Sequence, residues 1–422
     1  MKRFGKVWML CELGILLYIG ILLVLRSGIV ASPARRIQGI ENEGISFEEL
    51  RIPEGTEVIG IGEATHGNCE FQSIKLEMLK KLVESGKCRS IAFEITAGEG
   101  AEINDAIHRE DVDLTELMGR GDYPLYDTAQ IVELLSWMRE YNKSVSYEES
   151  LRFYGVDMQG PEREVRYLAG FAEAHKEAVS ESEGALLREM AEDEDYDFTL
   201  QREFFVALEQ KLAGQEDAEC RYAAVLAGVV LQWIDAPRFN EDPNAYGEHR
   251  DLCMAKNLKR YHELEEERGC TQILISAHNG HVMKGETEGY GEVTMGSRID
   301  ELFEGRYFCV GTGFYTATVN IHTAGTYDEE YERLDHSYCS DDILAYQARY
   351  FEGERYCLEF AGIKDEKLKQ LVHSKNFMGI VGEGYSRMSD ISRGYRMRLV
   401  VADRFDAVVY YYKVTPIRTI HY

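Results

Sequence analysis

The chain has 422 residues, of which 45% are hydrophobic and 29% are charged, and its formal net charge is −27. A chain of this length forms one large domain or two, and it has enough apolar side chains for a sizeable core. The acidic balance repels phosphates and anionic lipid head groups, so it excludes a nucleic-acid binder and favours neutral or cationic ligands.

The N-terminus carries a separate segment. Three basic residues within the first six positions precede an apolar stretch, 7–25, that only Glu12 interrupts. At about 1.5 Å per residue this stretch crosses most of a hydrocarbon core of about 30 Å. We therefore expect a membrane anchor and connector over 1–37, with the C-terminal domain extracytoplasmic in a single-pass protein of the cell membrane. A cleaved signal peptide is the alternative, although its apolar region would run about 7 to 15 residues.

Beyond residue 40, strand-like and helical patterns alternate along the chain. A strand over 56–62, a helix over 70–85 and a strand over 90–95 make a βαβ unit. The further expected elements are a helix over 128–141, a strand over 151–156, a helical insertion over about 161–268, and strands over 272–277, 306–319 and 407–412. This order predicts one α/β domain over 38–422, with three α/β/α layers and a mostly parallel sheet.

Three of these strands end on ionisable residues. The first runs into Glu63 and His66 in a glycine-flanked segment, the second ends on Glu94, and a later strand ends on His278, three residues before His281. In open α/β sheets, ligands bind outside the carboxyl ends of parallel strands. We therefore expect the side-chain ends of the first four residues to lie within about 10 Å of a common point in one catalytic cleft.

Four segments resemble, in order, the motifs of the erythromycin esterase family. They are Gly-Glu-Ala-Thr-His-Gly at 62–67, Phe-Glu at 93–94, Phe-Tyr-Gly-Val-Asp-Met-Gln at 153–159 and Ala-His-Asn-Gly-His at 277–281. A segment with Arg250, Asp251, Met254 and Asn257 resembles the helix that precedes the last motif, and the resemblance also reaches the closing strand. One departure is Lys75, which stands where the family usually has an arginine. Lysine lacks the planar bidentate fork of arginine, which bears on substrate binding more than on the chemistry.

The resemblance implies a hydrolase that cleaves an ester or a macrolide lactone. It implies His66 as the general base that activates a water, with Glu63 and Glu94 setting the polarity of the site and the water position. No Gly-x-Ser-x-Gly segment occurs in the sequence, so a serine nucleophile of the α/β-hydrolase type has no support. A small-molecule ester or lactone is then the expected partner, in addition to the membrane, and the acidic surface is compatible with the basic amino sugar of a macrolide.

The remaining candidates surround this base. His278 and Lys75 are candidates to stabilise the oxyanion or to hold the substrate, and His281 either contacts the substrate, orients His278 or caps a loop. Asp157 is grouped with the substrate-binding residues, where we expect it to position the others without contacting the substrate itself. Arg250, which precedes Asp251, is equally consistent with a structural ion pair to that neighbour.

Two alternatives stay open at the level of sequence. Glu63, Glu94 and the three histidines of the motifs supply nitrogen and oxygen ligands suited to zinc or manganese, and a metal-bound hydroxide would then replace the general base. The spacing does not decide this, and we favour a mechanism without a metal or other cofactor because two carboxylates and imidazoles can organise a water. The second alternative is a non-catalytic binding or cell-envelope assembly protein that keeps the esterase-like pocket.

Overall fold

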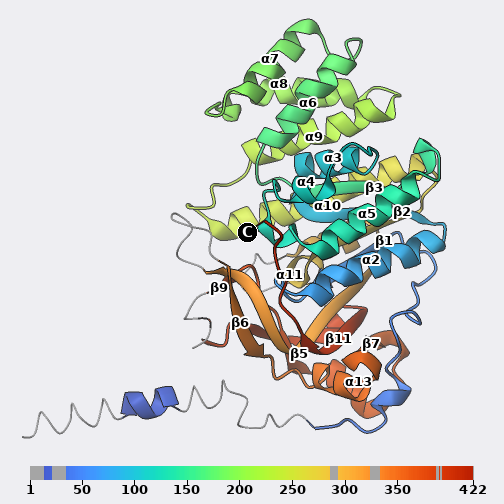
Figure 1. Ribbon diagram of the computed structural model, residues 1–422, viewed down its shortest axis with the longest axis vertical. Helices are drawn as coiled ribbons and strands as arrows, with labels where there is room; N and C mark the ends of the chain where they lie inside the picture. The colour runs from blue at the N-terminus through green and yellow to red at the C-terminus, as the bar shows by residue number, and fades with distance from the viewer. Residues whose placement is uncertain are drawn as a thin grey trace, which may run out of the picture.

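The structure is a computed structural model that describes residues 14–20, 35–285, 293–323, 333–385, 389 and 392–421 (Figure 1). The prediction of a transmembrane anchor as part of the fold class is wrong, because none of the described helices is long and apolar enough to cross a membrane. Within the stretch 7–25 a helix covers 14–20, and the other residues lie outside the described ones. The extracytoplasmic placement of the domain stays an untested prediction.

A mostly parallel sheet forms the middle layer. In spatial order the strands are β3 (Arg152–Asp157), β2 (Cys88–Thr96), β4 (Gln272–His278), β1 (Val58–Glu63), β5 (Tyr307–Thr323), β11 (Ala407–Val414) and β7 (Arg355–Glu359). Every neighbouring pair in this order is parallel except β11 with β7. The long strand β5 also pairs antiparallel with β6 (Arg333–Cys339) and parallel with β9 (Gly384–Tyr385). A separate antiparallel pair joins β8 (Lys375–Gly379) to β10 (Arg396–Val400).

Helices cover both faces of the sheet, so its central strands β1 and β4 are buried along their whole length. In β1, Ile59 and Ile61 belong to the core under α2 (Cys69–Glu84) and α5 (Ala129–Asn142). On the other face of β1, Val58 belongs to the opposite core, and the next two positions of that face are Gly60 and Gly62. That core lies under α3 (Ala97–Ala106), α10 (Pro243–Glu267) and α12 (Met295–Leu302). The three α/β/α layers expected from the sequence are therefore present.

The predicted insertion is helical and lies beyond the β3 edge of the sheet. It contains α6 (Glu162–Ala174), α7 (Glu181–Glu192), α8 (Arg202–Ala213) and α9 (Ala218–Ile234), which lie together at the top of Figure 1, and α10, which returns to the sheet. Three short helices lie in the connections between the longer elements: α4 (Leu114–Met118), α11 (Asn279–Val282) and α13 (Glu366–Val372). The cap of α9 is typical of the sequence, since Asp217 accepts the backbone N–H groups of Glu219 and Cys220.

Two elements had no readable pattern in the sequence. Strand β6 carries mostly polar side chains that stay partly or fully exposed, so it shows no alternation of apolar and polar residues. Helix α3 contains two glycines because its backbone lies close to other backbone. A Cβ on Gly100 would meet the Gly155 nitrogen at 2.0 Å, and one on Gly98 would meet the Glu164 nitrogen at 2.5 Å.

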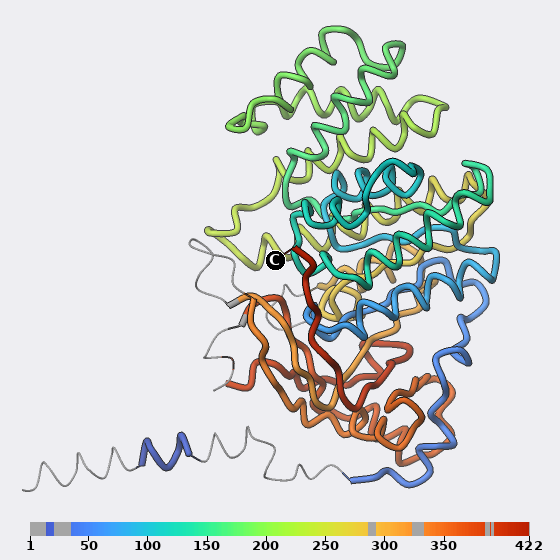
Figure 2. The backbone as a smooth tube through the Cα atoms, in the orientation of Figure 1, coloured from blue at the N-terminus to red at the C-terminus, as the bar shows by residue number. Residues whose placement is uncertain are grey.

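The C-terminal tail, 415–421, leaves β11 and crosses toward the start of α5, as the red tube in Figure 2 shows. Its backbone binds the loop that follows β1: the Ile417 N–H donates to the Gly67 carbonyl at 3.0 Å, and Asn68 Nδ2 donates to the Thr415 carbonyl at 2.9 Å. Further along, the Ile420 N–H donates to the Asp127 carbonyl at 2.9 Å. The tail therefore fixes the loop from outside the sheet.

Candidate active site

Four adjacent strands, β3, β2, β4 and β1, bring ionisable side chains to the same edge of the sheet. The register pairs Glu63 with His278 across β1 and β4. The rings of His66 and His278 have centroids 4.9 Å apart, and Glu94 Oε2 accepts the His278 backbone N–H at 2.9 Å. The structure thus brings together the four residues that the sequence assigned to one cleft, while their catalytic roles stay predictions.

The loop between β1 and α2 has a fixed conformation. Thr65 Oγ1 donates to Asn68 Oδ1 at 2.5 Å and accepts the Gly67 N–H at 3.2 Å. A Cβ on Gly67 would lie 2.5 Å from the Asn320 carbonyl oxygen on β5, so only glycine allows this close approach. These contacts, together with the C-terminal tail, hold His66 above the end of β1.

The carboxylate of Glu63 is buried and bound on both oxygens. Lys75 Nζ lies 2.7 Å from Oε1, and Gln72 Nε2 donates to Oε2 at 2.9 Å. Burial alone would raise the pKa of Glu63, but Lys75 and His66 together outweigh this effect and hold the pKa below its ordinary value. Lys75 itself is 0% exposed and lies over the rings of Phe93 and Tyr126, at 4.8 and 4.7 Å from their centroids. Its contacts are those of a counter-ion beneath Glu63, and none reaches an open surface.

The two ring nitrogens of His66 have different surroundings, and Nδ1 is the one that faces Glu63. Nδ1 lies 3.6 Å from Glu63 Oε2 and has no hydrogen bond, while the described residues place no partner at Nε2. The residue is 8% exposed. Burial lowers the pKa of His66, but the charge and proximity of Glu63 outweigh this effect and raise the pKa above its ordinary value. A carboxylate on the Nδ1 side favours a proton there, which leaves the Nε2 lone pair to accept one.

An ion network surrounds Glu94. Arg250 Nη2 lies 2.8 Å from Glu94 Oε1 and 2.5 Å from Asp157 Oδ2, and Arg250 Nε binds Asp157 Oδ1 at 3.0 Å. His281 bridges two acids, with Nδ1 at 2.7 Å from Asp251 Oδ1 and Nε2 at 3.2 Å from Glu94 Oε1. Each carboxylate in this network therefore meets at least one cationic side chain.

The charges of the network are well defined at neutral pH. Burial lowers the pKa of His281, but the Asp251 and Glu94 carboxylates raise it to about 10. Burial raises the pKa of Glu94, but His281 and Arg250 hold it well below its usual range. His281 is thus a cation and Glu94 an anion in the folded protein.

His278 is a neutral residue with both ring nitrogens engaged. Burial and the nearby charge of His66 lower its pKa to about 3. Nδ1 accepts the Gly280 N–H at 3.2 Å, so the ring proton lies on Nε2 and donates to the Val381 carbonyl at 3.2 Å. This pairing orients the ring beside His66.

A cavity of about 480 Å³ adjoins the ion network. Gln159 lines it and donates from Nε2 to Asp157 Oδ2 at 2.8 Å and to Tyr123 Oη at 3.0 Å. Tyr123 and Thr96, two residues after Glu94, line the cavity too. Gln159 thus connects this cavity to the ion network, although Glu94, Asp157 and Arg250 do not line it.

The two carboxylates proposed as metal ligands already hold cationic partners. Glu63 binds Lys75 and Glu94 binds Arg250, so a cation of the chain takes the place that a metal would need. Across the described residues, no group of three or more His, Cys, Asp or Glu side chains is arranged to hold a metal ion.

The family model for erythromycin esterase matches residues 83–414 of this chain. The chain belongs to the erythromycin esterase family. A curated relative, erythromycin esterase type II of Escherichia coli, is 25% identical over 322 residues, which cover 67% of this chain and 74% of that protein. The match spans three of the four motif segments, and the first motif, at 62–67, precedes it.

Solved structures share this fold. A succinoglycan biosynthesis protein aligns with a TM-score of 0.73 at 16% identity, covering 90% of this chain and 97% of that one. A protein from Bacillus cereus aligns with a TM-score of 0.72 at 18% identity, with the same coverage. The erythromycin esterase EreC, as a His-to-Asn mutant in its open conformation, aligns with a TM-score of 0.54 at 15% identity, covering 86% and 91%.

Several residues of the site escaped the sequence interpretation. For Arg250 the sequence is equally consistent with a site residue and with an ion pair to Asp251, whereas the structure pairs it with Glu94 and Asp157. The family-like helix motif around it was the available signal. Gln72 and Tyr126 gave none, because a glutamine on a helix face and an aromatic residue in a turn read as ordinary surface and core.

Proposed function

We propose that this member of the erythromycin esterase family hydrolyses a carboxylic ester or lactone with His66 as the general base. The observation that carries the proposal is the polarity of the His66 ring. Glu63, held by Lys75 and Gln72, faces Nδ1 at 3.6 Å, while Nε2 has no partner among the described residues. A positioned imidazole of this kind accepts a proton from water and returns it to a leaving group.

The reaction is a simple hydrolysis. Water attacks the carbonyl carbon while its proton passes to His66 Nε2, and the carbonyl electron pair moves to the oxygen. When the tetrahedral intermediate collapses, the C–O bond to the alkoxide breaks and the proton on Nε2 moves to that oxygen. One carboxylic acid and one alcohol, or one opened hydroxy acid from a lactone, are the products.

We assign the stabilisation of the developing oxyanion to Arg250. Its side chain is 15% exposed, more open than Glu94, Asp157 or His281. Nε and Nη2 are taken by carboxylates, but Nη1 contacts only His281 Nε2, at 3.3 Å, among the described residues. Since His281 is protonated and directs Nε2 toward Glu94, the Nη1 hydrogens are available to a carbonyl oxygen. Lys75, the earlier candidate for this role, is enclosed beneath Glu63.

A macrolide lactone is the substrate that the family name suggests, and the name of the Escherichia coli relative supports it. The net charge of −27 favours a ligand with a basic amino sugar over an anionic one. The cavity beside Tyr123 and Gln159 accommodates part of such a ligand, and polar side chains there are suited to hydroxyl groups.

The proposal is tested by incubating residues 38–422 with a panel of macrolides and simple esters, with and without a chelator, and measuring ring-opened or cleaved product. We expect turnover in the presence of the chelator. His66→Asn should lower kcat by about a hundredfold or more, since positioned bases contribute roughly 10² to 10⁴. His373→Asn, a substitution at a half-exposed histidine that faces Asp403, is the matched control and should leave kcat unchanged. Binding without turnover of any ester would instead support the binding-protein alternative.

A further inference from the structure

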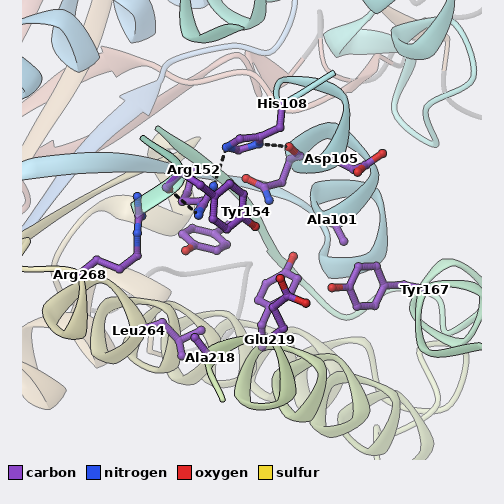
Figure 3. A pocket seen from close by; sticks show the side chains of 13 residues that line it. Ala101, Asp105, His108, Arg152, Tyr154, Tyr167, Ala218, Glu219, Leu264 and Arg268 are labelled. Carbon is purple, nitrogen blue, oxygen red and sulfur yellow. Dashed lines mark hydrogen bonds between the residues drawn. The ribbon is translucent and has the colours of Figure 1, made fainter. Parts of the chain in front are cut away.

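A second cavity, of about 310 Å³, lies at the opposite end of the sheet from the candidate active site. Its position follows from β3, because Arg152, the first residue of that strand, lines this cavity while Asp157, the last, belongs to the ion network. In Figure 3, Arg152 and Tyr154 lie on one side of the cavity and Tyr167 and Glu219 on the other. The two cavities are therefore separate sites.

Arg152 is a buried cation without a counter-ion. It is 7% exposed and donates to three neutral acceptors: His108 Nε2 at 2.5 Å, Ser150 Oγ at 2.8 Å and the Tyr147 carbonyl at 3.0 Å. Its guanidinium also lies 3.8 Å from the centroid of the Tyr147 ring. No carboxylate of the described residues lies within 4.0 Å of it. Burying a charge without a partner of opposite sign is costly.

The other charged groups that line the cavity are already paired. Arg268 binds both oxygens of Glu265, at 2.6 and 2.8 Å, Asp105 lies 3.2 Å from Arg109, and Glu219 lies 3.0 Å from His175. Glu265 therefore neutralises the charge of Arg268. Neither Asp105 nor Glu219 forms an ion pair with Arg152. Within the described part of the lining, Arg152 is the cation that has no carboxylate partner.

His108 does not compensate Arg152, because it is neutral in this position. Its Nδ1 donates to the Asn104 carbonyl at 2.7 Å, which leaves Nε2 as the acceptor that Arg152 uses. Burial and the positive charges of Arg152 and Arg268 lower the pKa of His108 below its ordinary value. The imidazole thus helps to aim the guanidinium without changing its charge.

The walls of the cavity suit a ring. Four tyrosines line it, Tyr147, Tyr154, Tyr167 and Tyr222, together with the apolar side chains of Ala101 and Leu264. The hydroxyl of Tyr222 is buried and has no hydrogen-bond partner. A buried hydroxyl without a partner costs free energy that an added acceptor restores.

We propose that this cavity binds a small organic acid, with its carboxylate on Arg152 and the Tyr222 hydroxyl and its cyclic body against the tyrosine rings. The volume of about 310 Å³ limits the ligand to a small molecule, far below a macrolide in size. A carboxylate matches the planar guanidinium and supplies the missing negative charge. The site is independent of the proposed esterase activity, because none of its residues touches the candidate active site.

The test uses the full chain and benzoate as the probe, with the neutral isostere benzamide as its control, in a calorimetric titration. We expect saturable binding of benzoate at least tenfold tighter than that of benzamide, since a charged hydrogen bond is worth more than a neutral one. Absence of saturable benzoate binding, or equal binding of the two probes, would overturn the proposal.

Two variants locate the bound probe. Arg152→Gln should weaken benzoate binding at least tenfold and leave ester hydrolysis unchanged. If that variant does not fold, Ala218→Phe decides, because Ala218 is an exposed residue that lines the cavity and a phenyl ring there should block entry. Arg202→Gln removes an exposed arginine paired with Asp235 and should bind benzoate normally.

The product of an esterase is also a carboxylate, so the candidate active site needs its own control. His66→Asn should leave benzoate binding unchanged. Loss of binding in His66→Asn, or retention of full affinity in both Arg152→Gln and Ala218→Phe, would place the probe elsewhere and refute the assignment.

Discussion

The Lys75–Glu63 pair offers a direct test of how the catalytic edge is built. The two side chains are 0% and 1% exposed and their charged atoms are 2.7 Å apart. Lys75→Met keeps a chain of similar length between the rings of Phe93 and Tyr126 but leaves the Glu63 carboxylate buried without its cation. Removing one partner of a buried pair costs about 3 to 5 kcal/mol, and we expect a loss of unfolding free energy in that range.

The expected signature is non-additivity. Glu63→Gln alone should also destabilise the protein, because it leaves the Lys75 ammonium buried without its anion. The double variant removes both charges, so its loss should fall short of the sum of the single losses by about 2 kcal/mol or more. Lys75→Arg keeps the charge and serves as the control that should lose much less than Lys75→Met.

Urea unfolding followed by circular dichroism measures these free energies, provided that the slope with denaturant stays constant among the variants. Independent sites add to within about 0.5 kcal/mol, so additivity of that quality between Lys75→Met and Glu63→Gln would refute the reasoning. An undiminished stability of Lys75→Met would do the same, since the lysine would then not be the counter-ion that holds Glu63 ionised.

The two histidines His66 and His281 and the C-terminal tail give three further tests of the site. Because His66 must be neutral to act as the base, kcat/KM should rise with pH through the raised pKa of His66. Glu63→Gln removes the charge that raises this pKa, so the rise should move to lower pH. A pH profile that does not move would contradict the role of Glu63. The pKa of His281 is raised from 6.5 to about 10, so its contribution to stability is complete below pH 6.5 and disappears as pH rises toward 10. Urea titrations should therefore show the gap between the unmodified protein and His281→Gln closing over that interval. Deleting 417–422 should lower kcat about tenfold or more in steady-state kinetics, with the domain still folded, because the loop that carries His66 loses its outer support.

The elements that the sequence predicted are those whose apolar residues recur in a pattern along the chain, either as a continuous run or at helical spacing. Apolar runs that end on Glu63, Glu94 or His278 mark buried parallel strands, and strands of one sheet end at one edge, so the convergence of these residues follows from the pattern alone. The helices α2 and α5 likewise show their apolar face in the spacing of residues such as Ile74 and Ile131.

The remaining features depend on partners far away in the chain. Lys75 reads as a solvated charge on a helix, and only the packing of Phe93 and Tyr126 over it shows that it is enclosed. Arg250 is adjacent to Asp251 in sequence, but consecutive residues point to different sides of a helix, so its partners come from β2 and β3 instead. Charge pairs of this kind leave no periodic trace in a single sequence.

The C-terminal tail has a consequence for the order of folding. The contact between Gly67 and Ile417 joins residues 350 positions apart, whereas the turn formed by Thr65 and Asn68 closes within four. Contacts between residues far apart in sequence form late, because closing a long loop costs conformational entropy. Pairing of the strands between the two residues shortens that loop first. We therefore expect hydrogen exchange during refolding to protect the amide of Ile417 after those of β1 and β4, so that the chain acquires its core before it acquires a competent base.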